Sequence, residues 1–255
     1  RIYSRHELLR EALAIPGWTV DRVISSRCLT AVCGILYRDG EAIVVWRGTN
    51  ITNRKTIKAN GRVDLVRFTV RLPGRQIPEL PGPAPDAGRV HAGLAELFGE
   101  VDLQVMTAIT NHLAVGRRVF VAGHSQGGGL AQLTAAGMLL LAWRQVNEDL
   151  APAGLITCGS MRAGDAQFSH FLTHAVPVDP EHGDFGILRF RNNNDIVPLL
   201  PPGRCGYRHA GEELYIWPNG VVSRNPGLAI KLYQRLKPIV CGIIGDGFAD
   251  HAIGE

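Results

Sequence analysis

The residues with the clearest chemical potential surround Ser125, within the stretch VFVAGHSQGGGLAQ (residues 119–132). The five residues GHSQG follow the pattern Gly-x-Ser-x-Gly, which is typical of a serine on a sharp turn between a strand and a helix. Glycine at both ends, Gly123 and Gly127, allows the strand and the helix to pass closely because glycine has no Cβ. Such a turn exposes the hydroxyl at the carboxyl edge of a sheet, so we predict that Ser125 is a catalytic nucleophile. A serine that only caps the following helix is the alternative.

The same turn places a hydrogen-bond donor beside the serine. The backbone N–H of Gln126 would lie in the first turn of the helix, where N–H groups have no partner within the helix and the helix dipole is positive. A donor in this position can stabilise the oxyanion of a tetrahedral intermediate. We therefore predict that Gln126 contributes to an oxyanion hole.

A serine hydroxyl is a weak nucleophile unless a base accepts its proton, and the base needs a carboxylate to orient it. For a serine on a strand-to-helix turn, the expected chain order is serine, acid, histidine. Asp195 ends the stretch RFRNNND directly after a predicted strand and directly before IVPLLPP, and it is the predicted acid. Asp165 and Asp184 are the other candidates, although each follows a weaker strand signal, and a solvated turn residue is the alternative for Asp195.

Two histidines follow the predicted acid, His209 and His251. His251 lies in a glycine-marked loop near the end of the sequence, and such a loop can reach over the sheet to the serine, so we favour it as the base over His209. His91 and His124 precede the acid or flank the serine, and we expect them to shape the site. This chemistry requires neither a metal nor an organic cofactor.

Alternating strand and helix patterns must position these residues. The apolar periodicity predicts helices over 92–113, 127–143 and 166–175 and strands over 118–123, 154–160 and 187–192. Two hairpins flank this region, one turning at 38–40 and the other at Asn219-Gly220. A capping box, Ser4 with Glu7, opens another helix. This order favours an α/β fold with a mostly parallel central sheet flanked by helices on both faces.

Composition limits the alternatives. The 255 residues are 45% hydrophobic and 20% charged, which permits a large core, and with no linker or repeat we expect one domain over 1–255. No apolar run approaches the roughly 18 residues of a membrane span. The chain begins at Arg1 without an initiator methionine, so we interpret it as a processed piece in which a leader would not be visible. Five cysteines without zinc-like spacing are expected to be buried small apolar side chains, with a bridge between Cys28 and Cys33 as one option.

The formal net charge of +4 is concentrated in one stretch. Residues 54–75 contain seven basic side chains against Asp64, a net charge of +6. No motif for nucleic-acid binding accompanies them. We expect a solvated surface, with attraction to an anionic interface as the alternative. The basic residues are Arg54, Lys55, Lys58, Arg62, Arg67, Arg71 and Arg75.

From about residue 30 to its end, the chain resembles the class 3 lipase family, the fungal-lipase-like branch of the α/β-hydrolases. The resemblance rests on seven stretches in the family's order: IVVWRGT (43–49), VHAGL (90–94), VAGHSQGG (121–128), TCGSMRAGD (157–165), NDIVPLLPP (194–202), YRHAGEELYI (207–216) and DH (250–251). It implies Ser125, Asp195 and His251 as the triad, in agreement with the interpretation above. It also implies that Thr49 provides a second oxyanion donor through its N–H and its hydroxyl. The implied function is a serine carboxylester hydrolase acting through an acyl-enzyme, a lipase or esterase on acylglycerols.

Two features depart from the family. Where relatives carry a short amphipathic lid, this chain has NITNRKTIKANGRVD (50–64), which has few large apolar residues and would bury little in an oil surface. The three disulfides of some secreted members cannot be made from five cysteines. A phospholipase, a short-chain esterase and an inactive hydrolase-like binding module are therefore the alternative functions. Basic charge and family habit favour export.

Overall fold

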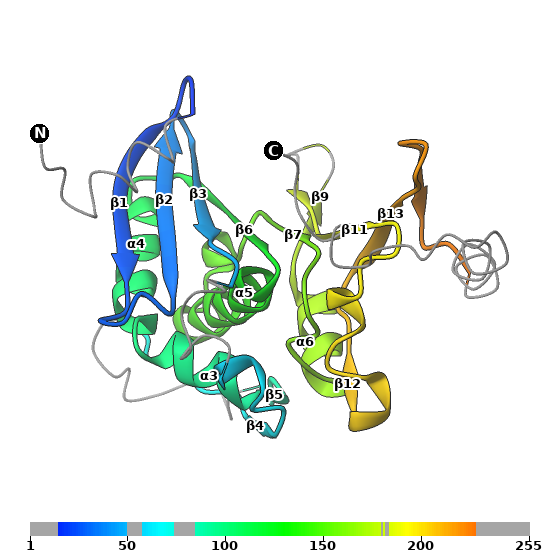
Figure 1. The fold of residues 1–255 in the computed structure, drawn as a ribbon. Helices are drawn as coiled ribbons and strands as arrows, with labels where there is room; N and C mark the ends of the chain where they lie inside the picture. Colours follow the sequence, from blue (N-terminus) through cyan, green and yellow to red (C-terminus); the bar gives the residue numbers. More distant parts are fainter. Residues whose placement is uncertain (1–14, 50–57, 74–84, 180, 182–183, 228–255) are drawn as a thin grey trace, which may run out of the picture.

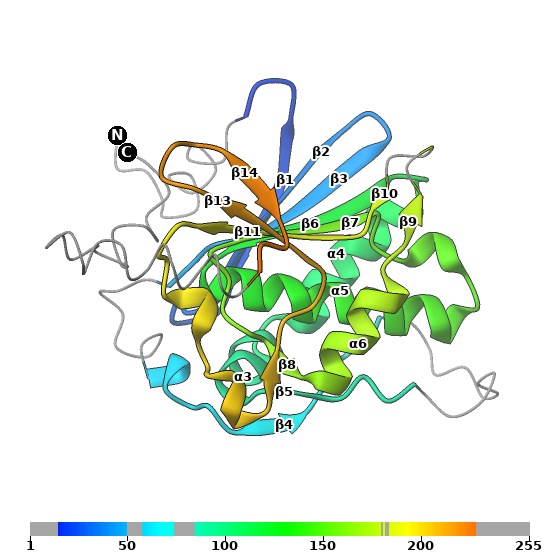
Figure 2. The same ribbon diagram turned by 90° about the vertical axis from the view of Figure 1, so that its right-hand side faces the viewer.

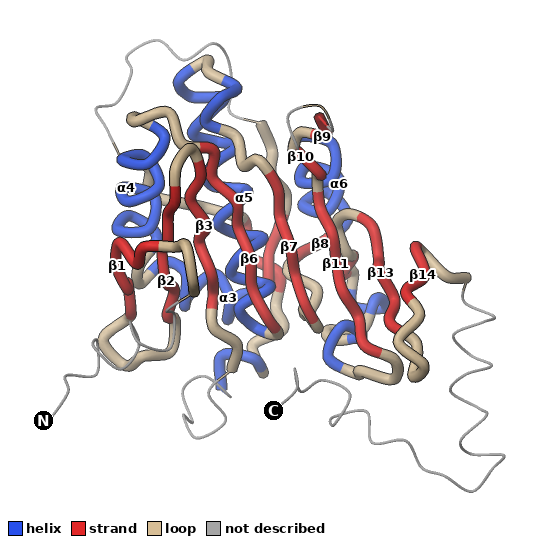
Figure 3. The backbone as a smooth tube through the Cα atoms, turned by 90° about the horizontal axis from the view of Figure 1, so that it is seen from above, coloured by secondary structure: helices blue, strands red, loops and turns tan. Residues whose placement is uncertain are grey.

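A computed structural model describes residues 15–49, 58–73, 85–179, 181 and 184–227. Its centre is an eight-stranded sheet in the order β1-β2-β3-β6-β7-β11-β13-β14 (Figures 1 and 3). The parallel middle strands are β3 (Glu41–Trp46), β6 (Arg118–His124), β7 (Gly154–Cys158), β11 (Ile187–Asn192) and β13 (Glu212–Ile216). The antiparallel strands at the two edges are β1 (Thr19–Ser25), β2 (Val32–Arg38) and β14 (Val222–Arg224).

The four α-helices whose bounds are described all lie on one face of this sheet (Figures 2 and 3). They are α3 (Ala92–Gly99), α4 (Asp102–Leu113), α5 (Gln126–Gln145) and α6 (Ala166–Ala175). The mostly parallel sheet with alternating helices confirms the predicted α/β class. The expectation of helices on both faces of the sheet is not met by these helices, which cover one face only (Figure 2). The helix predicted to begin at Ser4 lies outside the described residues.

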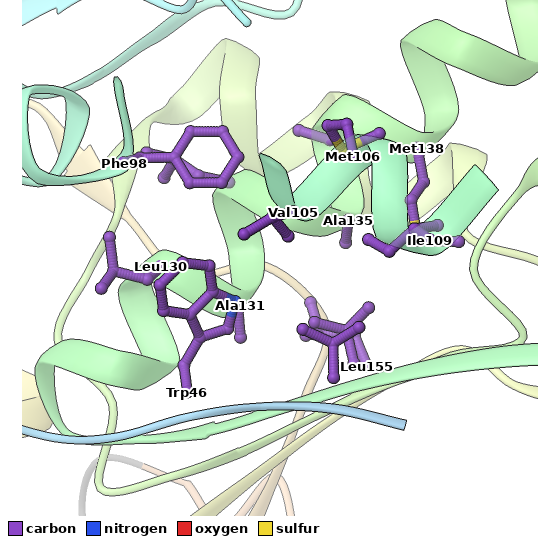
Figure 4. Packing of buried hydrophobic residues seen from close by; sticks show 14 of the residues in the cluster. Trp46, Phe98, Val105, Met106, Ile109, Leu130, Ala131, Ala135, Met138 and Leu155 are labelled. Atoms are coloured by element: carbon purple, nitrogen blue, oxygen red, sulfur yellow. The ribbon is translucent and has the colours of Figure 1, made fainter. Parts of the chain in front are cut away.

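The core lies between the sheet and these helices (Figure 4). Helix α5 is buried on nearly all sides, as its apolar composition predicts. Trp46 packs edge-on against Phe98 with ring centroids 6.1 Å apart, and its indole N–H donates to the hydroxyl of Thr134 at 2.9 Å. This contact joins the end of β3, the strand that pairs with β6, to α5, the helix that begins directly after the predicted nucleophile.

Both predicted hairpins are confirmed. Strands β2 and β3 pair antiparallel around the turn at 38–40, where Gly40 has a φ of 72°. Strands β13 and β14 pair across the turn at Asn219-Gly220.

The single helix predicted over 92–113 is instead two helices, so this prediction was wrong in its continuity. Val101 leaves the helical conformation with φ −134° and ψ −6° and becomes the N-cap of α4. The buried carboxylate of Asp102 then accepts hydrogen bonds from the backbone N–H groups of Leu103 at 2.7 Å and Arg71 at 2.9 Å. The apolar periodicity persists across the break because both helices turn their apolar sides to the same core.

A second, four-stranded sheet on the helix side of the molecule was not predicted. Its strands have only two or three residues, too few for an alternating pattern to be recognised. It lies near α3 and α6 (Figure 2) in the order β12 (Tyr207–Arg208), β8 (Gly164–Asp165), β5 (Arg89–His91), β4 (Leu65–Arg67). Strands β9 (Val178–Asp179) and β10 (Asp184–Phe185) form a separate pair. Three short 3₁₀ turns are η1 (Glu148–Leu150), η2 (Val197–Leu199) and η3 (Gly203–Cys205).

The suggested disulfide between Cys28 and Cys33 does not form. Cys28 is exposed and Cys33 is buried in β2, and no disulfide joins any of the four cysteines within the described ranges. Burial raises the pKa of the Cys33 thiol to about 12. Within the same ranges, no helix has the length and apolar character needed to cross a membrane.

Candidate active site

Ser125 occupies a strained turn between β6 and α5. Strand β6 ends at His124 and α5 begins at Gln126, so Ser125 is the N-cap of the helix, with φ 58° and ψ −126°. A positive φ is uncommon for any residue with a Cβ and persists only where surrounding contacts hold it. Here the N–H of Ser125 donates to the carbonyl oxygen of Cys158 at 2.9 Å, and the N–H of Gly128 donates to the Ser125 carbonyl at 3.0 Å. The turn thus fixes Ser125 between two parallel strands and a helix.

The two glycines of the motif are required by close backbone contacts. A Cβ on Gly123 would lie 2.2 Å from the carbonyl oxygen of Gly127. A Cβ on Gly127 would lie 2.5 Å from the carbonyl oxygens of Trp46 and Arg47. The predicted reason for the Gly-x-Ser-x-Gly spacing is therefore confirmed.

A largely apolar cavity of about 440 Å³ opens beside the serine. Ser125 lies in its wall and is 7% exposed. Both predicted oxyanion donors, Thr49 and Gln126, lie in the same wall. The structure thus brings three of the five predicted site residues together. The remaining lining residues are Gly48, Asn60, Val63, His124, Met161, Val197, Leu200, Pro201 and Pro202.

Asp195 follows β11 at the same edge of the sheet as Ser125. Strands β6, β7 and β11 are parallel neighbours, so residues after their carboxyl ends share one edge, and two inter-strand spacings separate β6 from β11 by about 10 Å. Asp195 is 1% exposed, and its Oδ1 accepts a hydrogen bond from the N–H of Val197 at 2.9 Å. The loop that carries the carboxylate therefore continues directly into the cavity wall.

The two alternative acids have other positions. The Asp165 carboxylate caps α6 by accepting from the N–H of Phe168 at 2.9 Å. Asp184 belongs to β10, which precedes β11, so its backbone lies toward the amino end of the parallel strands. Asp195 therefore has the expected position at the sheet edge, whereas Asp165 belongs to β8 of the second sheet and Asp184 to β10.

The half-buried Arg162 holds the loop after Asp195 in place. Its backbone N–H donates to the Leu200 carbonyl at 2.8 Å, and its guanidinium donates to the carbonyl of Pro201 at 2.7 Å and to that of Leu199. Leu200 and Pro201 line the cavity. This one arginine thus fixes a wall of the cavity.

His251, the favoured base, lies outside the described residues. The alternative, His209, is engaged elsewhere: its Nε2 lies 2.6 Å from the carbonyl oxygen of Pro198, to which it donates. Burial, together with the positive charges of Arg189 and Arg162, holds the pKa of His209 well below its usual value. His209 is not among the cavity-lining residues. His209 is therefore a neutral, structural histidine that supports the loop after Asp195.

His91 and His124 occupy the shaping positions expected of them. His124 lines the cavity directly before Ser125. His91 is fully buried, and its Nδ1 accepts from the N–H of Leu94 at 3.3 Å to cap α3. Burial lowers the pKa of His91 to about 4.

This depressed pKa predicts acid destabilisation. Between pH 6.5 and about 4, the unfolded chain protonates His91 while the folded chain does not, so the free energy of unfolding should fall as pH is lowered through this window. The contribution is at most on the order of 3 kcal/mol. Urea unfolding at pH 7.5 and pH 5 measures this change in the free energy of unfolding.

The variant His91→Asn keeps a capping oxygen and should make stability less dependent on pH. Because His209 contributes with the same sign, some dependence should remain. An unchanged pH dependence in His91→Asn would contradict this assignment.

Asn60 is a site residue that the sequence analysis missed. Its Nδ2 donates to the hydroxyl of Thr49 at 3.1 Å, and its Oδ1 accepts from the side-chain amide of Gln126 at 2.5 Å. Asn60 lies within the basic stretch that was interpreted as solvated surface. No local pattern distinguishes it, because its role depends on contacts with residues 11 and 66 positions away.

Comparisons with known proteins agree with this geometry. Residues 43–204 match the sequence profile of the family described as Lipase (class 3). The lipase of Rhizomucor miehei is 32% identical over 136 residues, which cover 51% of this chain and 34% of that protein. The secreted mono- and diacylglycerol lipase 1 of Fusarium solani is 30% identical over 129 residues, which cover 50% of this chain and 34% of that protein. The matched region is thus about one third of the length of these two relatives.

Solved structures of lipases also superpose on this chain. The native Rhizomucor miehei lipase propeptide complex superposes with a TM-score of 0.57 at 27% identity, covering 82% of this chain and 60% of that one. A triacylglycerol lipase whose catalytic centre is formed by a serine protease triad superposes with a TM-score of 0.54 at 26% identity, covering 78% and 67%. These proteins share the mostly parallel sheet and helix arrangement described above.

Proposed function

Because this chain belongs to the class 3 lipase family, we propose that it is a serine carboxylester hydrolase acting on acylglycerols and related esters. One observation carries the proposal: Ser125, on a strained turn, shares a largely apolar cavity of about 440 Å³ with Thr49 and Gln126. A cavity of this size and character suits an acyl chain. We further infer that residues 1–255 form one domain, because the described elements share one core.

The proposed mechanism has two half-reactions. The Oγ of Ser125 attacks the ester carbonyl carbon while His251 accepts the hydroxyl proton and passes it to the leaving alcohol. Asp195 orients the imidazole and stabilises its cation. Water, deprotonated by the same histidine, then attacks the acyl-enzyme and releases the acid. The backbone N–H groups of Gln126 and Thr49 hold the oxyanion in both steps.

A fluorophosphonate probe tests the proposal, since it forms a covalent adduct only with an activated serine. We expect one adduct per chain, on Ser125 in peptide mapping, and hydrolysis of nitrophenyl esters. A series from acetate to palmitate then separates a lipase from a short-chain esterase. A chain that forms no adduct and cleaves no ester would instead support the hydrolase-like binding module.

The charge around the cavity favours an anionic lipid surface as the place of reaction. Two segments, 58–67 and 200–208, contribute residues to the wall of the cavity. Together they carry five basic residues and one acidic residue. Their net charge of +4 equals that of the whole chain. Val63 and Leu200 are each 46% exposed there and line the cavity, which gives the basic region an apolar centre. Such a surface combines electrostatic attraction with apolar contact.

Vesicle binding measures this second proposal. We expect stronger co-sedimentation with vesicles containing phosphatidylglycerol than with pure phosphatidylcholine, and loss of the difference when salt is raised to about 1 M, where screening is nearly complete. The double variant Lys58→Gln/Arg204→Gln should lose the preference while hydrolysing a soluble short ester normally. Equal binding to both vesicle types would overturn the proposal. The secreted relative from Fusarium solani supports export, which fractionation of the source cells would test.

A further inference from the structure

Helix α6 carries two histidines one turn apart on its exposed side. His170 and His174 are both exposed, and the centroids of their imidazole rings lie 3.9 Å apart with an angle of 35° between the ring planes. Residues four positions apart share one face of an α-helix. The buried residues Phe168 and Leu172 hold the opposite face of α6 against the core. The two imidazoles therefore lie side by side where a dissolved ion can reach them.

A hydrogen bond within the helix sets the tautomer of one ring. The Nδ1 of His174 lies 2.9 Å from the backbone carbonyl oxygen of His170, and because a carbonyl oxygen only accepts, the ring donates through Nδ1. The Nε2 of the neutral ring then has a lone pair for a ligand bond. Histidines that bind metals commonly donate their other ring N–H to a carbonyl in this way, which fixes the orientation of the ring.

We propose that His170 and His174 together bind one divalent transition-metal ion, with Cu²⁺ preferred over Ni²⁺ and Zn²⁺. Imidazole nitrogen suits these ions, whereas Mg²⁺ and Ca²⁺ prefer carboxylate, carbonyl and water oxygens. The preference for Cu²⁺ follows the general order of affinity of the first-row divalent metals. Two histidines at positions i and i+4 are also the spacing with which a helix presents a pair of zinc ligands. This inference does not depend on the proposed ester hydrolysis.

The pair supplies two ligands, and the ion would take the others from solvent. No group of three or more histidine, cysteine or carboxylate side chains suited to a metal occurs in the described part of the chain. Two nitrogens completed by water oxygens match the tetragonal geometry of Cu²⁺. His174 also lies in the last turn of α6, where the negative end of the helix dipole favours a cation.

The other described histidines are less suited to bind an ion from solution. All of them are buried or half-buried. The Nδ1 of His91 accepts from the N–H of Leu94, and the two ring nitrogens of His112 contact Asp21 and Arg117. Among the described helices, only α6 carries two histidines four residues apart. These other histidines are His91, His112, His124 and His209.

Metal binding should also stabilise the folded chain. The hydroxyl of Ser169 donates to the His209 carbonyl at 2.5 Å, and the N–H of Gly211 donates to the hydroxyl of Thr173 at 3.0 Å. The two turns that the ion would bridge thus also hold the segment 209–211. Because an ion that prefers the folded state stabilises it by mass action, saturating Ni²⁺ should raise the melting temperature by about 3 °C or more.

Calorimetric titration of the whole chain with Cu²⁺ tests the proposal. His170→Gln and His174→Gln should each weaken the binding of one ion by about 10-fold or more, since even the loss of a partner behind a ligand costs about 10–100-fold. The double variant should bind within about 2-fold of either single variant, because each single change already breaks the chelate. Electron paramagnetic resonance of the wild type with one equivalent of Cu²⁺ should show two coordinated imidazole nitrogens.

The exchange variant His174→Ala/Ala175→His is the matched control. It keeps the composition and the number of histidines, but moves the second imidazole by about 100° around the helix. It should bind Cu²⁺ as weakly as the single variants and lose the rise in melting temperature with Ni²⁺. Melting in the presence of a chelator confirms that each variant is folded. Equal Cu²⁺ affinity in the wild type and the exchange variant, or a spectrum with fewer than two imidazole nitrogens, would overturn the proposal.

Discussion

Replacement of Ser125 by alanine should lower kcat for ester cleavage by about 10³-fold or more and leave the fold intact. The loss follows from the proposed covalent route, because alanine has no oxygen to attack the carbonyl carbon. The fold should survive because the Ser125 side chain makes no capping hydrogen bond to α5, so its removal leaves no buried partner unsatisfied there. The strained backbone is held by the N–H and carbonyl of residue 125, which alanine retains.

The measurement compares kcat/KM on nitrophenyl butyrate with thermal unfolding for the same preparations. Ser223→Ala provides the matched control, since Ser223 lies in β14 at the far edge of the sheet. That variant should keep full activity and full fluorophosphonate labelling. If Ser125→Ala retains most of the wild-type activity at an unchanged melting temperature, another residue is the nucleophile.

The site could be predicted from the sequence where its geometry is local. Gly123, Ser125 and Gly127 lie within five residues, and the steric reason for their spacing depends only on the turn that they form. Asp195 was found by a rule of slightly longer range: parallel strands present their carboxyl ends at one edge, so a polar residue after β11 faces the same side as one after β6.

Contacts between distant segments could not be predicted in this way. Asn60 is an ordinary polar residue in a basic stretch, and only the folded chain places its amide between Thr49 and Gln126. The break at Val101 was invisible because the two short helices keep one apolar periodicity. The structural role of His209 is likewise evident only from its contact with Pro198 in the folded chain. In each case, the deciding partner is far away in the sequence or the deciding dihedral leaves the hydrophobic pattern unchanged.

The identity of the base is the second decisive prediction. His251→Ala should lower kcat by about 10³-fold or more, because no group then accepts the proton of Ser125. His209→Gln should keep kcat within about 3-fold of the wild type, since its imidazole donates to the Pro198 carbonyl and a glutamine amide can donate in its place.

Substitution of His209 should instead change the stability of the fold. His209 is half-buried, and losing its bond to Pro198 would leave a carbonyl unsatisfied at a cost of about 1–3 kcal/mol. His209→Ala should therefore lower the melting temperature, whereas His209→Gln should lower it less.

Added imidazole should restore part of the activity of His251→Ala, because a small base can enter the space left by the side chain. The reverse pattern, an active His251→Ala and an inactive but stable His209→Gln, would transfer the role of base to His209 and require the contact with Pro198 to open during catalysis.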